Sequence, residues 1–160
     1  KAKLTDATLS IYGFVNDEQL NDKLKKLVAD KGLTDSVFFH NYIVDLSTAY
    51  QNASLFLGTS RYEGYDMAMV EALSYGIPII SYDIKYGPAD IVQNGVNGFL
   101  IKPNDYRGLA RKAIHLLQNP EVLQLFSNKA KRSAQRYSIN HSWQTWKKGL
   151  ATLRDKQEIQ

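Results

Sequence analysis

The sequence predicts an α/β fold, a Rossmann-like three-layer domain built around a mainly parallel sheet. Two observations predict it: short, continuously apolar segments alternate with segments of helical spacing, and glycine or proline separates many of them. Strands that are apolar throughout are typical of a parallel sheet with both faces covered. With 160 residues, 44% of them hydrophobic, the chain is long enough to bury such a core as one domain over residues 1–160.

The predicted strands are short runs rich in β-branched and aromatic residues: 8–13, 37–39, 55–58, 77–82 and 98–101. The predicted helices have apolar residues three or four positions apart, with caps or stops at their ends: 17–31, 45–51, 67–75, 88–93, 105–118, 121–137 and about 140–156. Asp45 is available as a cap, and Pro88 suits a first helical turn. In such a fold, ligands bind in the loops after the carboxyl ends of the strands.

Charge is distributed unevenly along the chain. The formal net charge is +4, yet residues 1–101 hold 8 Lys and Arg against 12 Asp and Glu, whereas residues 102–160 hold 12 against 4. A basic C-terminal half is typical either of solvated helix faces or of an anionic partner, such as lipid headgroups or a phosphate-containing polymer. No basic motif interleaved with aromatic residues indicates a nucleic-acid partner.

Composition and spacing disfavour several classes of protein. Without cysteine the chain forms no disulfide or thiolate metal site, which favours a reducing compartment. No apolar run approaches the roughly 18 residues of a membrane span. His40, His115 and His141 lack metal-ligand spacing. Gly13 is not followed by the further glycines of a dinucleotide-binding loop, so a nucleotide-cofactor oxidoreductase is set aside.

Glu71 is the only charged residue of the predicted helix 67–75, which is apolar nearly all round. We therefore expect this helix to be buried on more than one side. An ionised carboxylate in that setting costs several kcal/mol unless it finds donors. The vicinal hydroxyls of a sugar ring would supply two of them, and a cap or salt bridge to a neighbouring element is the alternative.

Glu63 precedes Glu71 by eight residues. On one continuous helix the two would lie roughly 12 Å and about 80° apart and would poorly share a ligand. If the helix begins near Asp66, Glu63 lies in the preceding loop and reaches across the helix N-terminus. The free backbone N–H groups of residues 64–67 then form a phosphate site at the positive end of the helix, and Gly64 lets a ligand approach closely. Two carboxylates that flank a diphosphate suit a sugar nucleotide.

These residues resemble the signature of the retaining family 4 glycosyltransferases, which have a two-domain B-type fold. The matching run is Ser60-x-x-Glu63-Gly64-Tyr65, then Glu71-Ala72, then Gly76-x-Pro78. Further matches in the same order are Leu9-x-Ile11-x-Gly13, Val37-x-Phe39, Tyr50-x-x-Ala53 and Gly95-x-x-Gly98-x-Leu100-Ile101-x-Pro103. The resemblance covers about residues 8–137 and is specific because it has many parts.

The resemblance implies a role for each matching residue. Glu71 would bind the ribose hydroxyls of the nucleotide, and Glu63 would face the donor sugar as the catalytic residue. The transferred sugar and distal phosphate would be held by a group at the helix start: Gly64, Tyr65, Asp66 and Met67. The main chain near Phe38 and Phe39 would contact the base. The family needs no metal, and a UDP-linked sugar is the expected donor.

One departure and one subgroup resemblance accompany this match. The family often has glycine where this chain has Asp66; its carboxylate would repel a diphosphate, unless it caps the helix and points away. The segment Ser81-Tyr82-Asp83-x-Lys85-Tyr86-Gly87-Pro88 is similar to a subgroup from Gram-positive bacteria that glycosylates teichoic-acid polymers or serine-rich surface proteins. Lys85 or Tyr86 would then reach the sugar or a phosphate, and an ordinary turn before Pro88 is the alternative.

The resemblance also implies that this chain is the C-terminal, donor-binding half of a longer enzyme. The family's basic pair on the diphosphate and its acceptor-binding domain have no counterpart here, so we expect the chain alone to bind donor weakly and transfer nothing. Trp143 and Trp146, on the last predicted helix, are expected to be packing residues rather than a binding platform. In this family the last helix crosses back onto the acceptor domain, which would leave them exposed here. The expected location is the cytoplasm or the inner face of the membrane, and the expected acceptor is a cell-surface polymer, glycan, lipid or protein.

Two other functions stay open from the sequence. One is a non-catalytic donor domain that acts as the partner of an active transferase, against which the presence of both glutamates speaks. The other is a module that binds an anionic polymer or membrane through the basic C-terminal half. Binding to acidic vesicles or to a teichoic-type polymer, without affinity for any sugar nucleotide, would favour the second.

Overall fold

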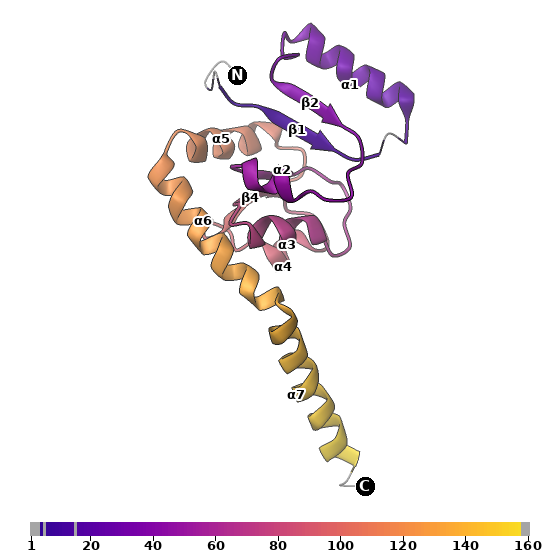
Figure 1. Cartoon of the computed structure of the whole chain (residues 1–160), viewed down its shortest axis with the longest axis vertical. Helices are drawn as coiled ribbons and strands as arrows, with labels where there is room; N and C mark the ends of the chain where they lie inside the picture. Colours follow the sequence, from indigo (N-terminus) through magenta and orange to yellow (C-terminus); the bar gives the residue numbers. More distant parts are fainter. Residues whose placement is uncertain (1–3, 5, 15, 158–160) are drawn as a thin grey trace. The chain divides into compact units, whose positions relative to one another are not determined.

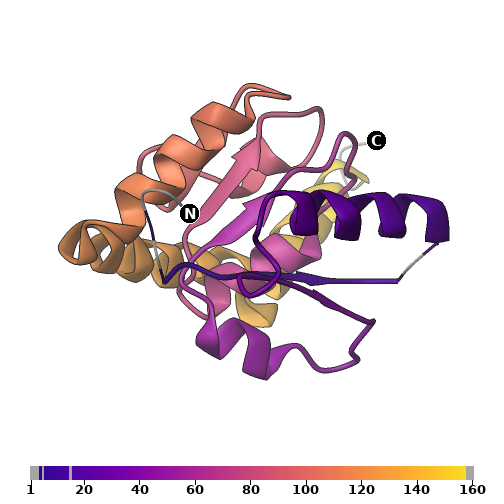
Figure 2. The same ribbon diagram turned by 90° about the horizontal axis from the view of Figure 1, so that it is seen from above.

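The computed structural model describes residues 4, 6–14 and 16–157, with side chains up to residue 152. The chain divides into two compact units, Lys1–Ala49 and Tyr50–Gln160. The first unit contains a strand–helix–strand motif made of β1 (Leu9–Tyr12), α1 (Glu18–Asp30) and β2 (Val37–His40), with α1 running alongside the strands (Figure 2). The two strands pair in parallel, with Leu9 opposite Val37 and Tyr12 opposite His40.

The second unit is built on a three-stranded parallel sheet of order β3-β4-β5, of which Figure 1 labels β4. Its strands are β3 (Phe56–Gly58), β4 (Ile79–Tyr82) and β5 (Gly98–Ile101). Helix α2 (Ser47–Asn52) leads into β3, α3 (Met67–Ser74) connects β3 to β4, and α4 (Pro88–Ile91) connects β4 to β5. The chain then continues through α5 (Tyr106–Leu117), α6 (Pro120–Ala134), a 3₁₀ turn (Gln135–Tyr137) and α7 (Ile139–Gln157).

Consecutive residues of β4 enter two different cores because successive strand side chains point to opposite faces of a sheet. Ile79 packs with residues of α3, α4 and α6: Met69, Leu73, Ile91 and Ala130. Ile80 packs with residues of β5, α5 and α6: Ile101, Leu109, Leu116 and Phe126. Both faces of the sheet are therefore covered, as its apolar strands predict.

The fold class expected from the sequence is confirmed, and the elements lie within a few residues of their expected bounds. The strands differ from the expectation in being divided between a parallel pair and a parallel trio. Helix α1 also buries less than its leucine spacing suggests, since Leu20 and Leu27 are about half exposed. Leu24 is exposed as well, and α1 has no fully buried residue.

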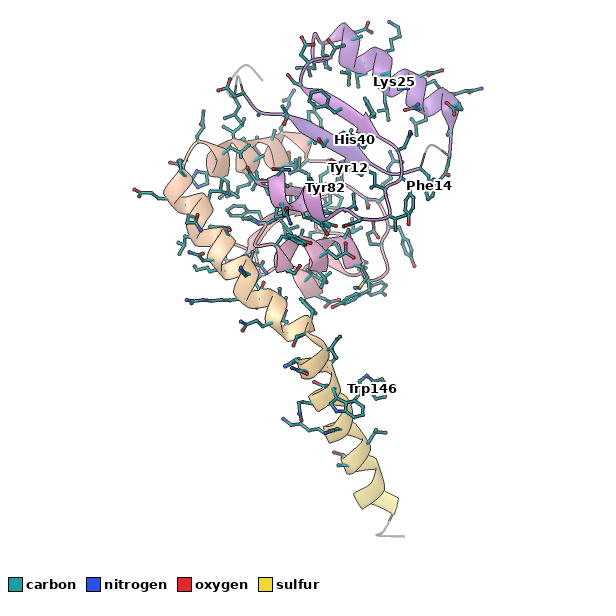
Figure 3. The ribbon with its side chains drawn as sticks, in the orientation of Figure 1. Tyr12, Phe14, Lys25, His40, Tyr82 and Trp146 are labelled. Carbon is teal, nitrogen blue, oxygen red and sulfur yellow. The ribbon has the colours of Figure 1, made fainter. Side chains whose placement is uncertain are left out.

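Helix α7 continues the polypeptide from α6 and carries exposed aromatic residues (Figure 3). Trp143 is 54% exposed and Trp146 is 68% exposed, so neither side chain is packed in a core in this structure. Within the described residues, no helix has both the length and the apolar character needed to cross a bilayer.

Gly98 offers a test of how tightly the sheet is packed. A Cβ atom at this position would overlap the backbone of Ile79 on the neighbouring strand. We expect Gly98→Ala to lower the free energy of unfolding by about 1–3 kcal/mol, the usual cost of overpacking. Urea denaturation followed by circular dichroism measures the change.

Gly149 is the matched control, because it lies within α7 and a Cβ there would meet nothing within 4 Å. Gly149→Ala should leave stability unchanged or raise it by up to about 1 kcal/mol, since alanine is the better helix former. Equal effects of the two substitutions would contradict the close packing of β5 on β4.

Candidate functional site

Two loops leave the same edge of the second unit's sheet. Because β3 and β4 are parallel neighbours with Gly58 opposite Ser81, residues 59–66 and 83–87 begin side by side at the carboxyl ends of their strands. Ligands of open α/β sheets bind at this edge. Most of the candidate donor-binding residues predicted from the sequence lie on these two loops and on α3, the helix that follows the first loop.

The two loops touch backbone to backbone. Gly87 has a φ of +100°, and a Cβ atom there would lie 2.5 Å from the carbonyl oxygen of Gly64. Only glycine combines this backbone conformation with so close an approach. The sequence predicted a role for Gly87 only as part of a motif, and it did not predict the contact with Gly64. The Gly87-Pro88 pair before a short helix is the signal that marks this turn.

The end of β3 is equally crowded. A Cβ atom at Gly58 would lie 2.6 Å from Cε of Met69 and 2.7 Å from Oγ of Ser81. The last residue of the strand is therefore packed directly under α3 and against β4. This contact fixes where the 59–66 loop begins relative to α3, the helix that follows the loop.

The N-terminus of α3 is capped by Asp66. Its Oδ1 accepts a hydrogen bond from the backbone N–H of Met69 at 3.2 Å, and its carbonyl oxygen accepts one from Val70 at 3.4 Å. Within the described part of the chain, the backbone N–H groups of residues 64–67 donate no hydrogen bond. Those amides lie at the positive end of the helix dipole, an arrangement that favours anions.

Asp66 points back onto the helix, as the capping alternative predicts. Burial of its half-buried side chain raises the pKa of the Asp66 carboxyl above its usual value, although the hydrogen bond from Met69 opposes the shift. The charges of Glu63 and Glu71 raise this pKa further. The start of α3 therefore combines free amides with a carboxylate that retains its proton to higher pH than usual.

Glu63 lies in the loop four residues before α3 begins, as predicted, and its side chain is half-buried. Glu71 lies within α3 and is exposed. Among the residues that the structure describes, neither glutamate forms an ion pair. Both carboxylates are therefore free of a cationic partner.

The expected burial of Glu71 is wrong. Met69, Ala72 and Leu73 face the core, whereas Glu71 is exposed and Met67 is 56% exposed, so α3 is buried on one side only. The sequence did not distinguish the two sides because nearly every residue of this helix is apolar. Oε2 of Glu71 accepts a hydrogen bond of 3.0 Å from the hydroxyl of Tyr50, a contact that the sequence did not predict.

Lys85 and Tyr86 lie in the segment between Gly87 and Tyr82, the last residue of β4. Figure 3 labels Tyr82. Both side chains are exposed, and Lys85 forms no ion pair within the described residues. Since Gly87 contacts Gly64, the turn that carries them is joined to the loop of Glu63. An unpaired ammonium on this turn suits an anionic ligand.

Phe38 and Phe39, expected near a nucleobase, belong to β2 in the first unit. Phe38 is 43% exposed and Phe39 is half-buried. Their backbone pairs with Ser10 and Ile11 of β1, so within this two-stranded sheet the other edge of β2 has no strand beside it. The contact of this main chain with the base stays a prediction.

Stacked rings mark the carboxyl ends of β1 and β2 (Figure 3). Tyr12 stacks on His40 with ring centroids 4.4 Å apart and planes 10° apart, and Phe14 stacks on Tyr42 at 4.4 Å and 7°. Sequence reasoning missed both pairs, although parallel pairing of β1 and β2 with Tyr12 opposite His40 would have brought the first pair together. Aromatic pairs of this kind typically contribute about 0.5–1.5 kcal/mol beyond area burial.

The fold defines a class of protein, the Rossmann-like α/β domains, whose ligands generally bind at the carboxyl ends of parallel strands. Comparison with known proteins supplies the family. The model of the family described as "Glycosyl transferases group 1" matches residues 1–133, and the chain belongs to this family.

Relatives with established names are similar to this chain over most of its length. The chain is 31% identical over 137 residues to a poly(ribitol-phosphate) alpha-N-acetylglucosaminyltransferase of Staphylococcus aureus, which covers 85% of this chain and 27% of the relative. It is 32% identical over 144 residues to a poly(glycerol-phosphate) alpha-glucosyltransferase of Bacillus subtilis, covering 90% of this chain and 21% of the relative. This chain thus spans about a quarter of the length of these relatives.

A solved structure shows the same likeness in three dimensions. A mutant of S. aureus TarM, in complex with Fondaparinux, alpha-GlcNAc-glycerol and UDP, superposes with a TM-score of 0.78 at 31% identity. The match covers 87% of this chain and 28% of the TarM chain. It agrees with the α/β Rossmann-like fold described above.

Two substitutions distinguish the effect of the Asp66 charge on stability from the effect of its capping hydrogen bond. Asp66→Ala removes the cap and should lower the free energy of unfolding by about 1 kcal/mol. Asp66→Asn keeps a capping side chain and removes the charge. Because the pKa of Asp66 is raised on folding, the wild type loses stability as pH rises from the ordinary value of 3.8 through the raised value.

Asp66→Asn should therefore gain stability relative to the wild type on going from pH 3 to pH 7. Thermal unfolding at both pH values measures this difference. A relative stability that does not change with pH, or that changes in the opposite direction, would contradict the raised pKa.

Proposed function

We propose that the full-length protein carrying this chain is a retaining family 4 glycosyltransferase that moves a sugar from UDP to a hydroxyl acceptor. One observation carries the proposal: two loops from adjacent parallel strands meet at the N-terminus of α3, where free amides lie beside carboxylates without ion-pair partners. In the proposed complex the amides of residues 64–67 hold the distal phosphate and the sugar. Glu71 accepts from the ribose hydroxyls, and Glu63 faces the sugar.

The proposed reaction breaks the bond between C1 of the sugar and the phosphate oxygen, and forms a bond from C1 to the acceptor oxygen on the same face. The acceptor proton passes to an oxygen of the departing diphosphate. Preorganised amides and a cation such as Lys85 would stabilise the negative charge that develops there. The two curated relatives are named as alpha-transferases. Since UDP-glucose and UDP-N-acetylglucosamine are themselves α-linked, retention is the stereochemistry that such products require.

UDP is the proposed nucleotide because the TarM complex, at 31% identity, contains it. The main chain of Phe38 and Phe39 remains our proposal for the base contact. We further propose that residues 1–160 supply the donor half and that a separate acceptor domain completes the enzyme. The small fraction of each relative that this chain covers supports this division.

The proposed acceptor is a polymer that contains phosphodiesters. We propose that this polymer is glycosylated at the cytoplasmic face of the membrane. The curated relatives are named for poly(ribitol-phosphate) and poly(glycerol-phosphate). The exposed basic side chains of α5 and α6 suit such a polyanion: Arg107, Arg111, Lys112, Lys131 and Arg132. Of these, within the described residues, only Arg111 is in an ion pair, at 3.7 Å from Asp105.

The roles of the two glutamates can be tested in the full-length protein by calorimetry and turnover. Glu71→Ala should weaken the affinity for UDP-glucose, UDP-N-acetylglucosamine and GDP-mannose alike, to whatever extent each binds, because all three share the ribose. A lost charged hydrogen bond corresponds to about 1.5–3 kcal/mol, or roughly 10- to 150-fold in Kd. Glu63→Gln should depress kcat more than affinity.

Glu121→Gln, an exposed glutamate in the first turn of α6, is the matched control and should change neither quantity. If Glu71→Ala and Glu63→Gln both kept the affinity and turnover of the wild type, the proposed roles would be rejected. Binding of acidic vesicles without binding of any sugar nucleotide would support the anionic-surface module instead.

No metal is proposed in the reaction, because helix amides and basic side chains supply the positive charge that the diphosphate needs. Turnover should therefore be the same, within error, before and after dialysis against excess EDTA. A loss of activity that Mg²⁺ or Mn²⁺ restores would show that a cation takes part. Heat-treated enzyme serves as the blank.

A further inference from the structure

Tyr50 lies along the outer face of α3. Its hydroxyl oxygen is 3.0 Å from Oε2 of Glu71 and 3.4 Å from the carbonyl oxygen of Ala68. Its ring stacks on that of Tyr75, with centroids 5.3 Å apart and planes 25° apart. Ala68, Glu71 and Tyr75 are spaced i, i+3 and i+7, so they share one face of the helix. A single side chain thus contacts two residues of α3 and the residue at its C-cap.

The hydrogen bond between Tyr50 and Glu71 has a defined direction. An ionised carboxylate can only accept, so the phenol donates. The ring of Tyr50 is only 9% exposed, and burial together with the adjacent Glu71 raises the pKa of the phenol well above its usual value. Tyr50 therefore remains a protonated donor throughout the pH range in which such an enzyme works.

This bond leaves most of the carboxylate free. A carboxylate offers about four lone-pair positions on its two oxygens, and Tyr50 occupies one of those on Oε2. Glu71 is otherwise exposed and has no ion-pair partner within the described residues, so the remaining positions can accept from a ligand. A free glutamate on a helix surface would sample several rotamers, whereas the phenol restricts this one before a ligand arrives.

We infer that Tyr50 is a positioning residue, which holds the Glu71 carboxylate in the orientation that receives the vicinal hydroxyls of a nucleotide ribose. This inference rests on the proposed function, because it takes Glu71 to be the group that binds ribose. It adds a residue that contacts no part of the donor and acts through the carboxylate. Tyr50 is held on α3 by its stacking on Tyr75 and does not need the ligand to find its place.

A purely structural role is the competing explanation, and the ligand's own hydroxyls separate the two. UDP carries the 2′ and 3′ hydroxyls, whereas 2′,3′-dideoxy-UDP lacks both and cannot use Glu71. In the full-length protein, Tyr50→Phe keeps the ring and its stacking but removes the donor. We expect calorimetry to give an affinity for UDP about tenfold weaker, or about 1.4 kcal/mol, and an unchanged affinity for dideoxy-UDP.

Tyr75→Phe is the matched control. It removes a hydroxyl from the other ring of the same stacked pair, and no described residue forms a hydrogen bond with that hydroxyl. Its affinities for both nucleotides should equal those of the wild type. The double variant Tyr50→Phe/Glu71→Ala should bind UDP no more weakly than Glu71→Ala alone, because the phenol acts only through the carboxylate.

Each failure has its own signature. Equal weakening of UDP and dideoxy-UDP by Tyr50→Phe would identify a structural role and overturn the inference. So would an unchanged affinity for UDP in Tyr50→Phe while Glu71→Ala is impaired. If Glu71→Ala itself bound UDP as tightly as the wild type, the proposed function of Glu71 would fall, and the role of Tyr50 with it.

Discussion

The start of α3 at Met67 is the constraint on which the candidate site depends. The Asp66 side chain accepts from Met69, and this cap ends the helix on its N-terminal side. If the helix continued back to residue 60, the amides of residues 64–67 would be used in helical hydrogen bonds. Glu63 would then stand roughly 12 Å from Glu71. One capping carboxylate thus releases both the amides and the first glutamate from the helix.

The position of this helix is in turn set by the sheet beneath it. Met69 and Leu73 anchor α3 in the same core as Ile79, and the Met69 side chain also crowds Gly58 at the end of β3. Gly87 brings the neighbouring loop against Gly64. The geometry at the strand ends is therefore held by close contacts that involve no charge, which leaves the charged side chains free to meet a ligand.

Much of this arrangement could be predicted from local patterns in the sequence. Strand and helix positions follow from apolar spacing, and the cap at Asp66 follows from a carboxylate directly before an apolar helix. The exposure of Glu71 could not be predicted, because only Glu71 and Ser74 are polar in α3 and the pattern does not show which side faces out. The contacts of Tyr50 with Glu71 and of Gly87 with Gly64 join residues more than 20 positions apart, beyond the reach of local rules. The division of the strands into two sheets likewise depends on long-range packing.

The close packing around the glycines at the strand ends also limits which positions near the candidate site can be substituted. Any side chain at Gly58 or Gly87 would displace a neighbour, whereas Arg61, Tyr62 and Tyr86 are exposed, so substitutions there displace no packed neighbour. Mutational libraries aimed at new sugar preferences should therefore randomise those loop tips and keep the glycines constant. Packing fixes the glycines at the strand ends, whereas the exposed loop tips nearby are not packed against neighbours.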